Sequence, residues 1–517
     1  MALVGVALVI FVLQVNSLVN LPGTVDGIAA SHARGLGAWQ VATLLRDGSG
    51  GAGTAQVEAA IADEVAATET TLTPAQAYSK RIESIRKADV GSRVASFPVG
   101  VAAGKNVIII QVESLETMIV GARVGSQEIT PNLNKLLKES WYFPNTYAET
   151  GGGNTADAEF VANTGLYPPP TGEAASIAYV DRELPGLPRM LRAQGYRAIT
   201  FHGNDAHYWN RTELYRALGF NKFYDRDFFG NRDRIWIGPS DEVLFEDGFE
   251  VIRGLYKKKQ PFYAQFITLS SHPGYSAIPE NRRPLEVPER NYGTFNGNYT
   301  SSMSYADLAL GKFITDLKRS GLWDDSVVMI YGDHTAHLHQ ETANDRSYLA
   351  GFLGRRANYS DRQRVPLLIH IPGQKKVARV QTTASQMDIM PTVADLVGID
   401  LSQQPHMGRS VFVDSPELAV FRSYFPGGSF VSGGTIFMPG LSFSDGVAIK
   451  VSDGSPALPG SVTQADYDRT QQLDALSDSW VRSLPRRSDV GDINDAFIPG
   501  VTPKDQLEDK LRPKTKK

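Results

Sequence analysis

The chain has 517 residues, 42% of them hydrophobic and 9% aromatic, as is typical of a folded protein with one large domain and smaller additions. Its 21% of charged residues and formal net charge of −4 argue against a nucleic-acid or other general polyanion binder. The absence of cysteine excludes disulfides, thiolate zinc sites, iron–sulfur clusters and cysteine nucleophiles.

The first 20 residues, MALVGVALVIFVLQVNSLVN, are mostly apolar and carry no charged side chain. A helix that spans a bilayer needs about 20 mostly apolar residues, so this segment is just long enough. No basic residue precedes it, as one would in a secretory signal peptide. We therefore predict a transmembrane helix at residues 1–20, either alone or as the last helix of a longer membrane region. A buried helix of a soluble protein is the alternative.

Residues 21–100 are predicted to form a helical linker. A Gly/Ser-rich stretch at 46–56 separates two helix-like segments, VEAAIADEVAATET (57–70) and PAQAYSKRIESIRKADV (74–90). The second segment carries Lys, Arg and Glu at helical spacing, which predicts a solvated helix.

From residue 105 onward, continuous apolar runs alternate with helical patterns. The runs are KNVIIIQVES (105–114), YRAITFHG (196–203), PFYAQFITLSSH (261–272), DSVVMIYGDH (325–334) and VPLLIHIPG (365–373). Such runs are typical of strands buried on both faces of a parallel sheet. Helical patterns lie between and after them, at 184–195, 302–321 and 385–399. The alternation predicts a doubly wound α/β domain over residues 101–410.

After residue 411 the alternation fades. FRSYFPGGSFVSGGTIFMPG (421–440) is Gly-rich with the alternation of strands, and YDRTQQLDALSDSWVRSLPRR (467–487) is helix-like. These patterns predict a small α+β subdomain at 411–500. The last residues, 501–517, mix basic and acidic side chains and are predicted to be a disordered tail.

Ionisable residues stand at the ends of four of the predicted strands. They are Glu113, His202, His272 and the pair Asp333-His334. The carboxyl ends of strands in such a sheet meet at one edge, where ligands bind, and Glu, Asp and His donors without sulfur suit a hard or borderline divalent cation. Each residue alone has an ordinary structural explanation, such as a helix cap, a turn or a satisfied core histidine. Their joint occurrence predicts a site.

The segment GGGNTADAEF (151–160) predicts the start of a helix with a hydroxyl at its first turn. Three glycines let the backbone approach a ligand closely, and Asn154 and Asp157 are the residue types favoured at the cap and the first turn. Thr155 would then lie at the positive end of the helix, where a phosphate binds readily. A metal-coordinated threonine hydroxyl can act as a nucleophile. Glycine-rich turns before helices are common, so this motif alone is a weak signal.

Five motifs together resemble a known family. NVIIIQVES, GGGNTADAEF, FHGNDAHYWNR, ITLSSHP and YGDH, in this order, resemble the lipoteichoic acid synthases, phosphoglycerol transferases of the alkaline phosphatase/sulfatase superfamily. The resemblance covers roughly residues 100–410. It implies an α/β fold with a doubly wound, mixed or parallel sheet of alkaline phosphatase/sulfatase type.

The resemblance also implies the metal and catalytic residues. Glu113, Thr155, Asp333 and His334 would hold one Mn²⁺ ion, or Mg²⁺ or Zn²⁺ in its place, and Thr155 would also be the nucleophile. His272 would be a second catalytic residue that positions the phosphate or carries a proton.

The phosphoglycerol itself would be bound by Asn204, Trp209, Arg211 and His272, with His202 in a supporting position. The family often has an acidic residue where Asn204 stands, which puts the contact to the glycerol hydroxyl in question, although Asp205 is adjacent. Two further histidines, His337 and His339, follow the YGDH motif and are either a second metal site or exposed loop residues.

The implied protein is an enzyme of the cell membrane with an extracytoplasmic catalytic domain. It would take glycerophosphate from phosphatidylglycerol, release diacylglycerol, and pass the glycerophosphate to a hydroxyl of a lipoteichoic acid-type polymer or a glycolipid. Transfer to a periplasmic glucan is the first alternative. A sulfatase or phosphodiesterase is the second, although the Cys/Ser-x-Pro-x-Arg nucleophile motif of sulfatases is not seen at 150–160. A non-catalytic protein of envelope assembly is the third.

Overall fold

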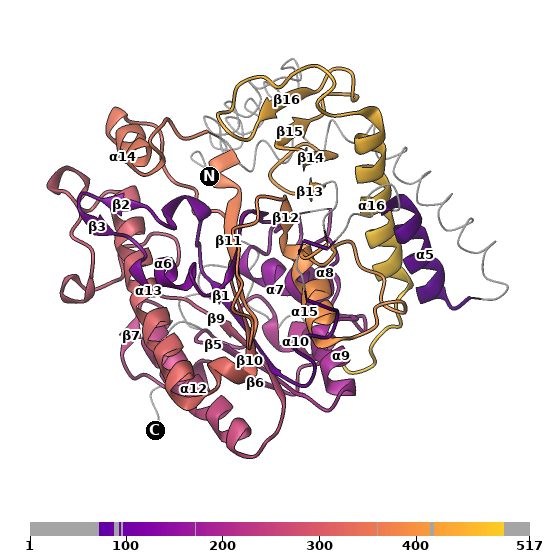
Figure 1. Ribbon diagram of the computed structural model, residues 1–517, viewed down its shortest axis with the longest axis horizontal. Helices are drawn as coiled ribbons and strands as arrows, with labels where there is room; N and C mark the ends of the chain where they lie inside the picture. The colour runs from indigo at the N-terminus through magenta and orange to yellow at the C-terminus, as the bar shows by residue number, and fades with distance from the viewer. Residues whose placement is uncertain are drawn as a thin grey trace, which may run out of the picture. The chain divides into compact units, whose positions relative to one another are not determined.

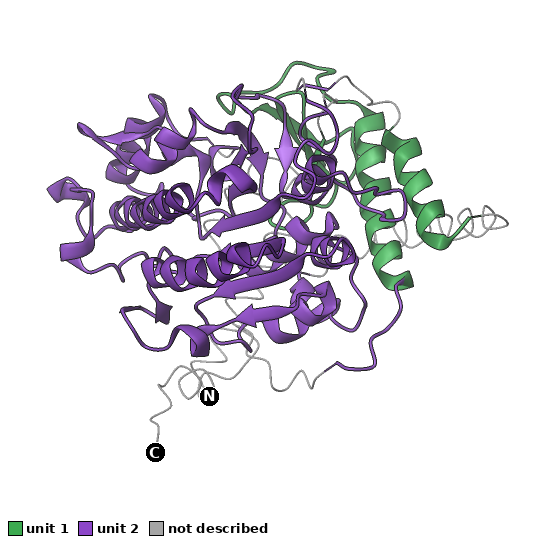
Figure 2. Cartoon of the chain, turned by 60° about the horizontal axis from the view of Figure 1, so that its bottom comes forward, with its two compact units in different colours: residues 1–91, 415–483 green, residues 92–414, 484–517 purple. Residues whose placement is uncertain are grey.

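The computed structural model describes residues 72–86, 93–94, 97–170, 172–358, 360–413 and 418–490. They divide into two compact units, one from residues 1–91 and 415–483 and the other from 92–414 and 484–517 (Figure 2). The membrane helix predicted at 1–20 and the tail predicted at 501–517 lie outside the described residues. Within the described ranges, no helix has the length and apolar character needed to cross a bilayer.

The larger unit contains an eight-stranded sheet with the strand order β12-β4-β11-β10-β1-β9-β5-β6 (Figure 1). The strands β6, β5, β9, β1 and β10 run parallel, whereas β11 pairs antiparallel with both β10 and β4. The sheet is therefore mixed and mostly parallel, within an α/β fold. The bounds are β1 (Asn106–Val112), β4 (Trp141–Tyr147), β5 (Arg197–His202), β6 (Lys222–Tyr224), β9 (Phe262–Ile267), β10 (Ser326–Gly332), β11 (Arg364–His370) and β12 (Ala384–Ser385).

The continuous apolar runs are explained by burial on both faces of this sheet. On β1, Ile108 and Ile110 belong to one hydrophobic cluster, and Val107 and Ile109 belong to another on the opposite face. The first face is covered by α6 (Pro131–Leu136), α12 (Asp241–Lys257) and α13 (Phe295–Ser320), and the second by α7 (Thr155–Thr164), α9 (Leu187–Ala193) and α15 (Ile389–Val397).

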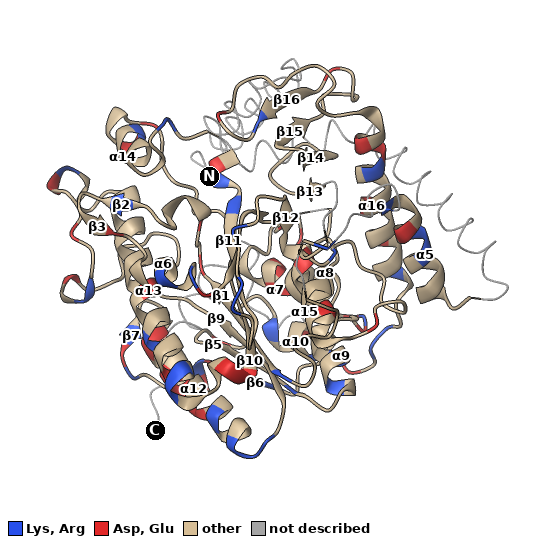
Figure 3. Ribbon diagram, viewed as in Figure 1, with Lys and Arg blue, Asp and Glu red and all other residues tan. Residues whose placement is uncertain are grey.

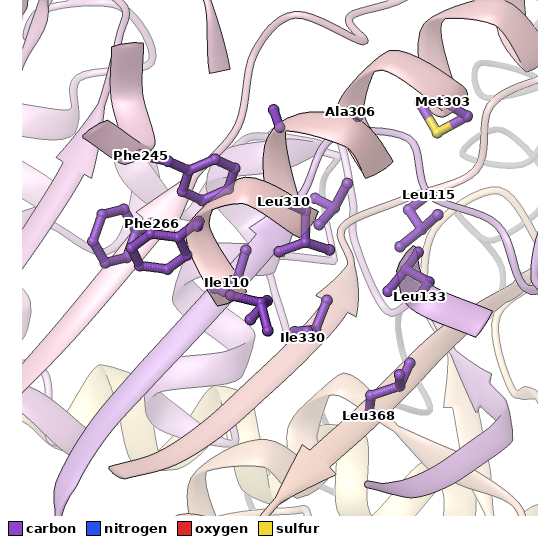
Figure 4. Packing of buried hydrophobic residues seen from close by; sticks show 14 of the residues in the cluster. Ile110, Leu115, Leu133, Phe245, Phe266, Met303, Ala306, Leu310, Ile330 and Leu368 are labelled. Carbon is purple, nitrogen blue, oxygen red and sulfur yellow. The ribbon is translucent and has the colours of Figure 1, made fainter. Parts of the chain in front are cut away.

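Figure 4 shows the packing of the first face, where Phe245 of α12 and Leu310 of α13 lie over Phe266, Ile110 and Ile330 of the sheet. Each buried side chain of this size contributes about 1.5–3 kcal/mol to folding. The same two helices carry both basic and acidic residues (Figure 3), and Lys312 of α13 forms an ion pair with Glu242 of α12.

The strand β4 was not predicted from the sequence, because Pro144 interrupts the segment WYFPNTY. The pairing of β4 with β11 has a register shift between Val365 and Leu367. A bulge of this kind accommodates a proline within a strand. The remaining short elements of this unit are β2 (Arg123–Val124), β3 (Gln127–Glu128), β7 (Arg234–Ile235), β8 (Gly238–Pro239), α8 (Ala175–Ala178), α10 (Arg211–Leu218), α11 (Arg226–Phe229) and α14 (Ala343–Leu353).

The smaller unit combines a four-stranded antiparallel sheet with two helices. The sheet has the order β13 (Ala419–Phe421), β14 (Ser429–Ser432), β15 (Thr435–Met438) and β16 (Val447–Lys450), and the helices are α5 (Pro74–Arg86) and α16 (Gln464–Ser483). The rings of Tyr78 and Trp480 lie 5.2 Å apart between the two helices. The prediction of a solvated helix at 74–90 is therefore wrong in one respect, since α5 buries Tyr78, Ile82 and Ile85.

The start of α6 depends on a carboxylate from another helix. Asp307 of α13 accepts hydrogen bonds from the backbone N–H groups of Asn132 and Leu133, at 2.9 and 2.8 Å. These N–H groups have no partner within their own helix, and the side chain of Thr130 at the cap position makes no capping bond.

We expect Asp307→Ala to lower the free energy of unfolding by about 1–3 kcal/mol, because two buried N–H groups lose their acceptor. The measurement is the midpoint of thermal unfolding. The control is Asp316→Ala on the same helix, whose partially exposed ion pair with Arg319 should contribute about 0–1 kcal/mol. Equal effects of the two substitutions would contradict the assigned role of Asp307.

Candidate active site

The sheet order brings the predicted site residues to one edge. β10, β1, β9 and β5 are neighbours and run parallel, so their carboxyl ends lie side by side. Glu113 follows β1, Asp333 follows β10 and His202 is the last residue of β5. His272 does not end a strand, since β9 stops at Ile267 and the histidine lies at the end of the loop 268–272.

Glu113, Asp333 and His334 form a buried cluster. Nε2 of His334 lies 3.2 Å from Oε1 of Glu113 and 3.4 Å from Oδ2 of Asp333. One ligand atom from each residue lies within 4.8 Å of the others, and this is the group of possible metal ligands found in the described part of the chain. The three side chains are at most 6% exposed.

The electrostatics of the cluster indicate a shortage of positive charge. Burial, followed by the charge of Glu113, raises the pKa of Asp333 to about 7. Burial opposes protonation of His334, but Asp333 and Glu113 outweigh it and raise the histidine pKa to about 10. For Glu113, burial is again the largest influence and acts upward, yet His334 and other groups lower the pKa to about 2. Two buried carboxylates thus share one imidazolium, and a bound cation would complete the balance.

The polar atoms of the cluster fit a divalent cation. Oδ1 of Asp333 accepts hydrogen bonds from the backbone N–H groups of Ser114 and His334, at 2.7 and 2.8 Å, whereas its buried Oδ2 has no hydrogen-bond partner. Nδ1 of His334 lies 3.0 Å from the carbonyl oxygen of Thr335. In the neutral tautomer Nδ1 donates to that carbonyl, which leaves the lone pair of Nε2 directed at the two carboxylates. Oxygen and nitrogen donors of this kind suit Mn²⁺, Mg²⁺ or Zn²⁺.

The hydroxyl of Thr155 joins this cluster. Thr155 is the first residue of α7, and its Oγ1 donates a hydrogen bond to Oε2 of Glu113 at 3.2 Å and lies 3.3 Å from Nε2 of His334. The carbonyl of Thr155 accepts a hydrogen bond from Gln111 of β1 at 3.0 Å. The sheet therefore holds the helix start directly against the carboxylates.

The glycines before Thr155 make close contacts within the protein. Oδ2 of Asp157 accepts the N–H groups of Gly151 and Gly153, at 2.9 Å each. A Cβ on Gly153 would lie 2.4 Å from Oδ1 of Asp157, and a Cβ on Gly152 would lie 1.9 Å from the carbonyl oxygen of Gly172. The contacts that require glycine are thus with the chain itself, which differs from the close approach to a ligand that the motif predicts.

Contrary to the sequence prediction, Asn154 does not cap α7 with its side chain. It occupies the cap position with a positive φ of 43°, which favours glycine, and its side chain makes no capping hydrogen bond. Asp157 is buried, and this burial raises its pKa to about 6 although three backbone N–H groups oppose the shift. The carboxylate of Asp157, rather than Asn154, organises the turn before Thr155.

Arg211 is held by a buried ion pair. Its Nε and Nη2 lie 2.9 Å from Oε1 of Glu159 on α7, and its Nη1 donates to the carbonyl of Tyr208 at 3.2 Å. Burial opposes the charge of Arg211, but Glu159 raises the guanidinium pKa above its usual value. The charge of Arg211 contributes to lowering the pKa values of His202 and His272, so Arg211 lies near both.

The other predicted binding residues are His202, Asn204 and Trp209. His202 is buried, its Nδ1 lies 3.1 Å from the carbonyl of Ile267, and burial followed by the charge of Arg211 lowers its pKa well below the usual value. Asn204 is buried beside it, and Trp209 is half-buried with a φ of 56°. Asp205, which the sequence offers as a substitute acidic group, is already paired with Arg226 at 2.8 Å.

His272 is half-buried, and burial lowers its pKa although the charge of Glu113 opposes the shift. Of the two histidines after the YGDH motif, His339 stacks on Phe295 with ring centroids 4.2 Å apart. Neither His337 nor His339 belongs to a group of possible metal ligands among the described residues.

Comparison with known proteins decides the family. The family described as Sulfatase matches residues 105–399, which is more than half of the chain. The chain belongs to the sulfatase family. Within the alkaline phosphatase/sulfatase superfamily it is lipoteichoic acid synthase-like, as the five sequence motifs predict.

Two curated relatives and one solved structure define that similarity. The chain is 34% identical over 343 residues to lipoteichoic acid synthase 2 of Bacillus subtilis (strain 168), covering 64% of this chain and 50% of that protein. It is 36% identical over 319 residues to lipoteichoic acid synthase of Staphylococcus aureus (strain USA300), covering 60% and 48%. The chain thus spans about half the length of the curated relatives it matches.

The crystal structure of the lipoteichoic acid synthase LtaP from Listeria monocytogenes superposes with a TM-score of 0.74 at 35% identity, covering 79% of this chain and 100% of that one. A protein of the alkaline phosphatase superfamily from Vibrio parahaemolyticus shares the fold, with a TM-score of 0.60 at 21% identity.

Three residues of the site in this sulfatase-family chain are not predicted from the sequence. They are Glu159, Asp241 and Trp236. Glu159 anchors Arg211, and its position in GGGNTADAEF, one helical turn after Thr155, is a signal that could have suggested it. Asp241 accepts the N–H groups of Leu269 and Ser270, at 2.8 and 3.0 Å, and so holds the loop that leads to His272. Trp236 packs against His272 with ring centroids 4.5 Å apart, and no motif indicates it.

We expect Mn²⁺ to raise the melting temperature of the chelator-treated protein, because the ion binds the folded cluster and not the unfolded chain. Asp333→Asn should abolish this rise without lowering the melting temperature of the metal-free protein, since the amide keeps one oxygen acceptor and removes a buried charge. The measurement is thermal unfolding with and without Mn²⁺.

The matched control for this experiment is Asp316→Ala, on the outer side of α13, which should keep the full rise. A rise of equal size in Asp333→Asn would place the ion elsewhere.

Proposed function

We propose that this chain is a membrane-anchored, extracytoplasmic phosphoglycerol transferase that takes glycerophosphate from phosphatidylglycerol and passes it to a hydroxyl acceptor. The observation that carries the proposal is the convergence of the Thr155 hydroxyl with Glu113 and His334 at the start of α7. A hydroxyl in this place is suited to attack phosphorus, because the helix start and the cluster both favour a phosphate. The similarity to lipoteichoic acid synthases, the family that the sequence motifs resemble, supports the choice of phosphoglycerol as the transferred group.

The metal ligands in this proposal are Glu113, Asp333, His334 and Thr155 itself. A bound divalent cation neutralises charge on the phosphoryl oxygens and makes a neighbouring hydroxyl more acidic. Of the four residues, Thr155 is assigned as the nucleophile because it supplies a hydroxyl at the start of a helix. Its Oγ1 donates a hydrogen bond to Oε2 of Glu113.

The proton transfers of the first step are assigned to Thr155 and His272. The Thr155 oxygen forms a bond to phosphorus while the bond from phosphorus to the diacylglycerol oxygen breaks. The threonine proton is released to solvent, and protonated His272 gives a proton to the departing oxygen. Burial lowers the pKa of His272, which makes its protonated ring a stronger acid near neutral pH.

The second step reverses these transfers. The acceptor hydroxyl gives its proton to neutral His272, and its oxygen attacks the phosphorus. The bond to Thr155 breaks, and Thr155 takes up a proton from solvent. Atoms and protons balance over the two steps, which transfer glycerophosphate from one hydroxyl to another.

Recognition of the donor is assigned to Arg211, Trp209 and Asn204. Glu159 fixes the guanidinium of Arg211 in one orientation, and a fixed planar cation suits a phosphate group. Trp209 and Asn204 are proposed to contact the glycerol. Because the donor is a lipid, the site must work at a bilayer surface, which is the reason to propose the membrane helix at 1–20. A lipoteichoic acid-type polymer or a glycolipid is the proposed acceptor.

We expect the 517-residue protein with Mn²⁺ to release diacylglycerol from a fluorescent phosphatidylglycerol in mixed micelles, and Thr155→Ala to reduce the rate at least about 10³-fold, as loss of a nucleophile does. Thr155→Ser should retain part of the activity, because it keeps the hydroxyl. The measurement is the rate of appearance of fluorescent diacylglycerol.

The matched control is Thr164→Ala at the other end of α7, where the hydroxyl donates to the carbonyl of Phe160 and accepts from the N–H of Leu166. Turnover of a sulfate ester or of phosphatidylethanolamine in place of phosphatidylglycerol would overturn the proposed donor. Addition of a periplasmic glucan or a glycolipid to the same assay identifies the acceptor by which of them becomes labelled.

A further inference from the structure

The hairpin formed by β7 and β8 presents an unusual residue at its tip. Arg234 pairs with Pro239 and Ile235 with Gly238, so the loop consists of Trp236 and Ile237. Trp236 has a φ of 53° and is 50% exposed. Two-residue hairpin loops with positive φ at the first position favour glycine, because a side chain there strains the backbone. A bulky, half-exposed tryptophan at this position indicates a role outside folding.

The hairpin is fixed from its base. Ser240 donates hydrogen bonds to Asp233 from both its N–H and its hydroxyl, at 2.8 and 2.6 Å, and Asp233 forms an ion pair with Arg282. Nε of Arg234 donates to the carbonyl of Trp236 at 2.9 Å. Hydrogen bonds therefore fix the backbone at the tip of the hairpin as well as at its base. A fixed backbone at Trp236 restricts the directions in which the indole can point.

The hairpin also lies against two segments of the candidate site, the one that follows His202 and the one that leads to His272. A Cβ on Gly238 would lie 2.4 Å from the carbonyl oxygen of Gly203 and 2.7 Å from Cδ2 of Leu269. Gly203 directly follows His202, and Leu269 lies in the loop that leads to His272. This packing brings Trp236 to the edge of the sheet where the cluster lies.

Trp236 packs against His272 in a tilted arrangement, with ring centroids 4.5 Å apart and an angle of 44° between the rings. The hydrogen bond recorded for the His272 ring is a long one, 3.4 Å from Nδ1 to the carbonyl of the adjacent Pro273. Such a bond restrains the ring weakly. The backbone of the His272 loop is held by Asp241, so the indole is the main restraint on the imidazole itself. The face of an indole also attracts a protonated imidazole.

We propose that Trp236 is a positioning residue for the reaction, which holds the imidazole of His272 in the orientation that exchanges protons with the leaving and attacking oxygens. This inference rests on the proposed function, in which His272 acts on both oxygens. Trp236 itself touches neither phosphorus nor the metal ligands. Loss of the indole should therefore change the rate of the chemical steps more than the binding of the lipid.

The kinetic test compares Trp236→Ala, Trp236→Phe and the unchanged 517-residue protein with phosphatidylglycerol and Mn²⁺. We expect Trp236→Ala to lower kcat about 10²-fold, the size of effect that a small misplacement of a reacting group produces, with KM changed by less than about threefold. Trp236→Phe should recover most of kcat, because a phenyl ring can stack on imidazole. Wild-type kcat in Trp236→Ala, or a change in KM alone, would overturn the proposal.

Two further variants separate positioning from folding. Trp236→Gly should melt at a higher temperature than Trp236→Ala, because glycine favours positive φ, and yet have the same low kcat. Tyr292→Ala is the matched control, since Tyr292 is another exposed aromatic, 54% accessible, and should leave kcat unchanged. A Trp236→Gly protein with full activity would overturn the proposal.

A spectroscopic readout tests the ring contact without any turnover. In the ring-proton NMR spectrum of the histidines, assigned with His272→Gln, the ring current of Trp236 should shift the resonances of His272. Trp236→Ala should remove the shift and Trp236→Phe should keep part of it. If the wild-type protein releases no diacylglycerol, the proposed function fails, and these spectra then decide whether Trp236 orients His272. Unchanged His272 resonances in Trp236→Ala would overturn the inference in either case.

Discussion

The structure depends on the burial of two carboxylates beside each other. β1 and β10 pair in parallel with Val112 opposite Gly332, so the next residues, Glu113 and Asp333, are neighbours by register. Burying such charges costs several kcal/mol for each ion, and only compensating positive charge makes the arrangement tolerable. His334 supplies one charge from the same loop as Asp333. The negative charge that His334 leaves unbalanced favours a bound cation at this edge of the sheet. A bound cation would in turn attract a phosphate to the hydroxyl of Thr155.

Other buried acids tie the loops of the site to the scaffold. Asp157 holds the glycine turn before Thr155, Glu159 holds the guanidinium of Arg211, and Asp241 holds the loop that carries His272. Each carboxylate accepts several N–H donors, so its burial is compensated by strong hydrogen bonds. The site residues lie on loops and at the ends of strands and helices, and their positions are set by charged contacts to rigid elements. Loops that are held in this way can supply reacting groups in fixed positions.

Much of this arrangement can be predicted from the sequence. The direction of β11, the strand β4 and the partner of Arg211 cannot. The five apolar runs form strands because a strand buried on both faces needs apolar residues throughout. Where β1 and β10 end, the polar residues that follow lie at the carboxyl ends of the parallel strands. Apolar runs report burial but not direction, so they do not reveal that β11 is antiparallel. Pro144 hides β4. The partner of Arg211 is Glu159, 52 residues away in the chain. The place of Glu159 one helical turn after Thr155 indicates that it lies near the site, but the spacing does not reveal that it pairs with Arg211.

Backbone strain is the feature of the site that sequence patterns reveal least. Non-glycine residues with positive φ include Ser114 beside Glu113, Asn154 beside Thr155, Trp209 and Asn210 before Arg211, and Trp236 against His272. Each such residue costs of order 1–3 kcal/mol, and the surrounding structure must hold it in place. Glycine would remove the strain at each position, but glycine would also remove the side chain. At Trp236 the two requirements conflict most clearly, because the backbone favours glycine and the ring contact with His272 needs an aromatic ring. The proposed positioning of the imidazole accounts for a tryptophan at this strained position.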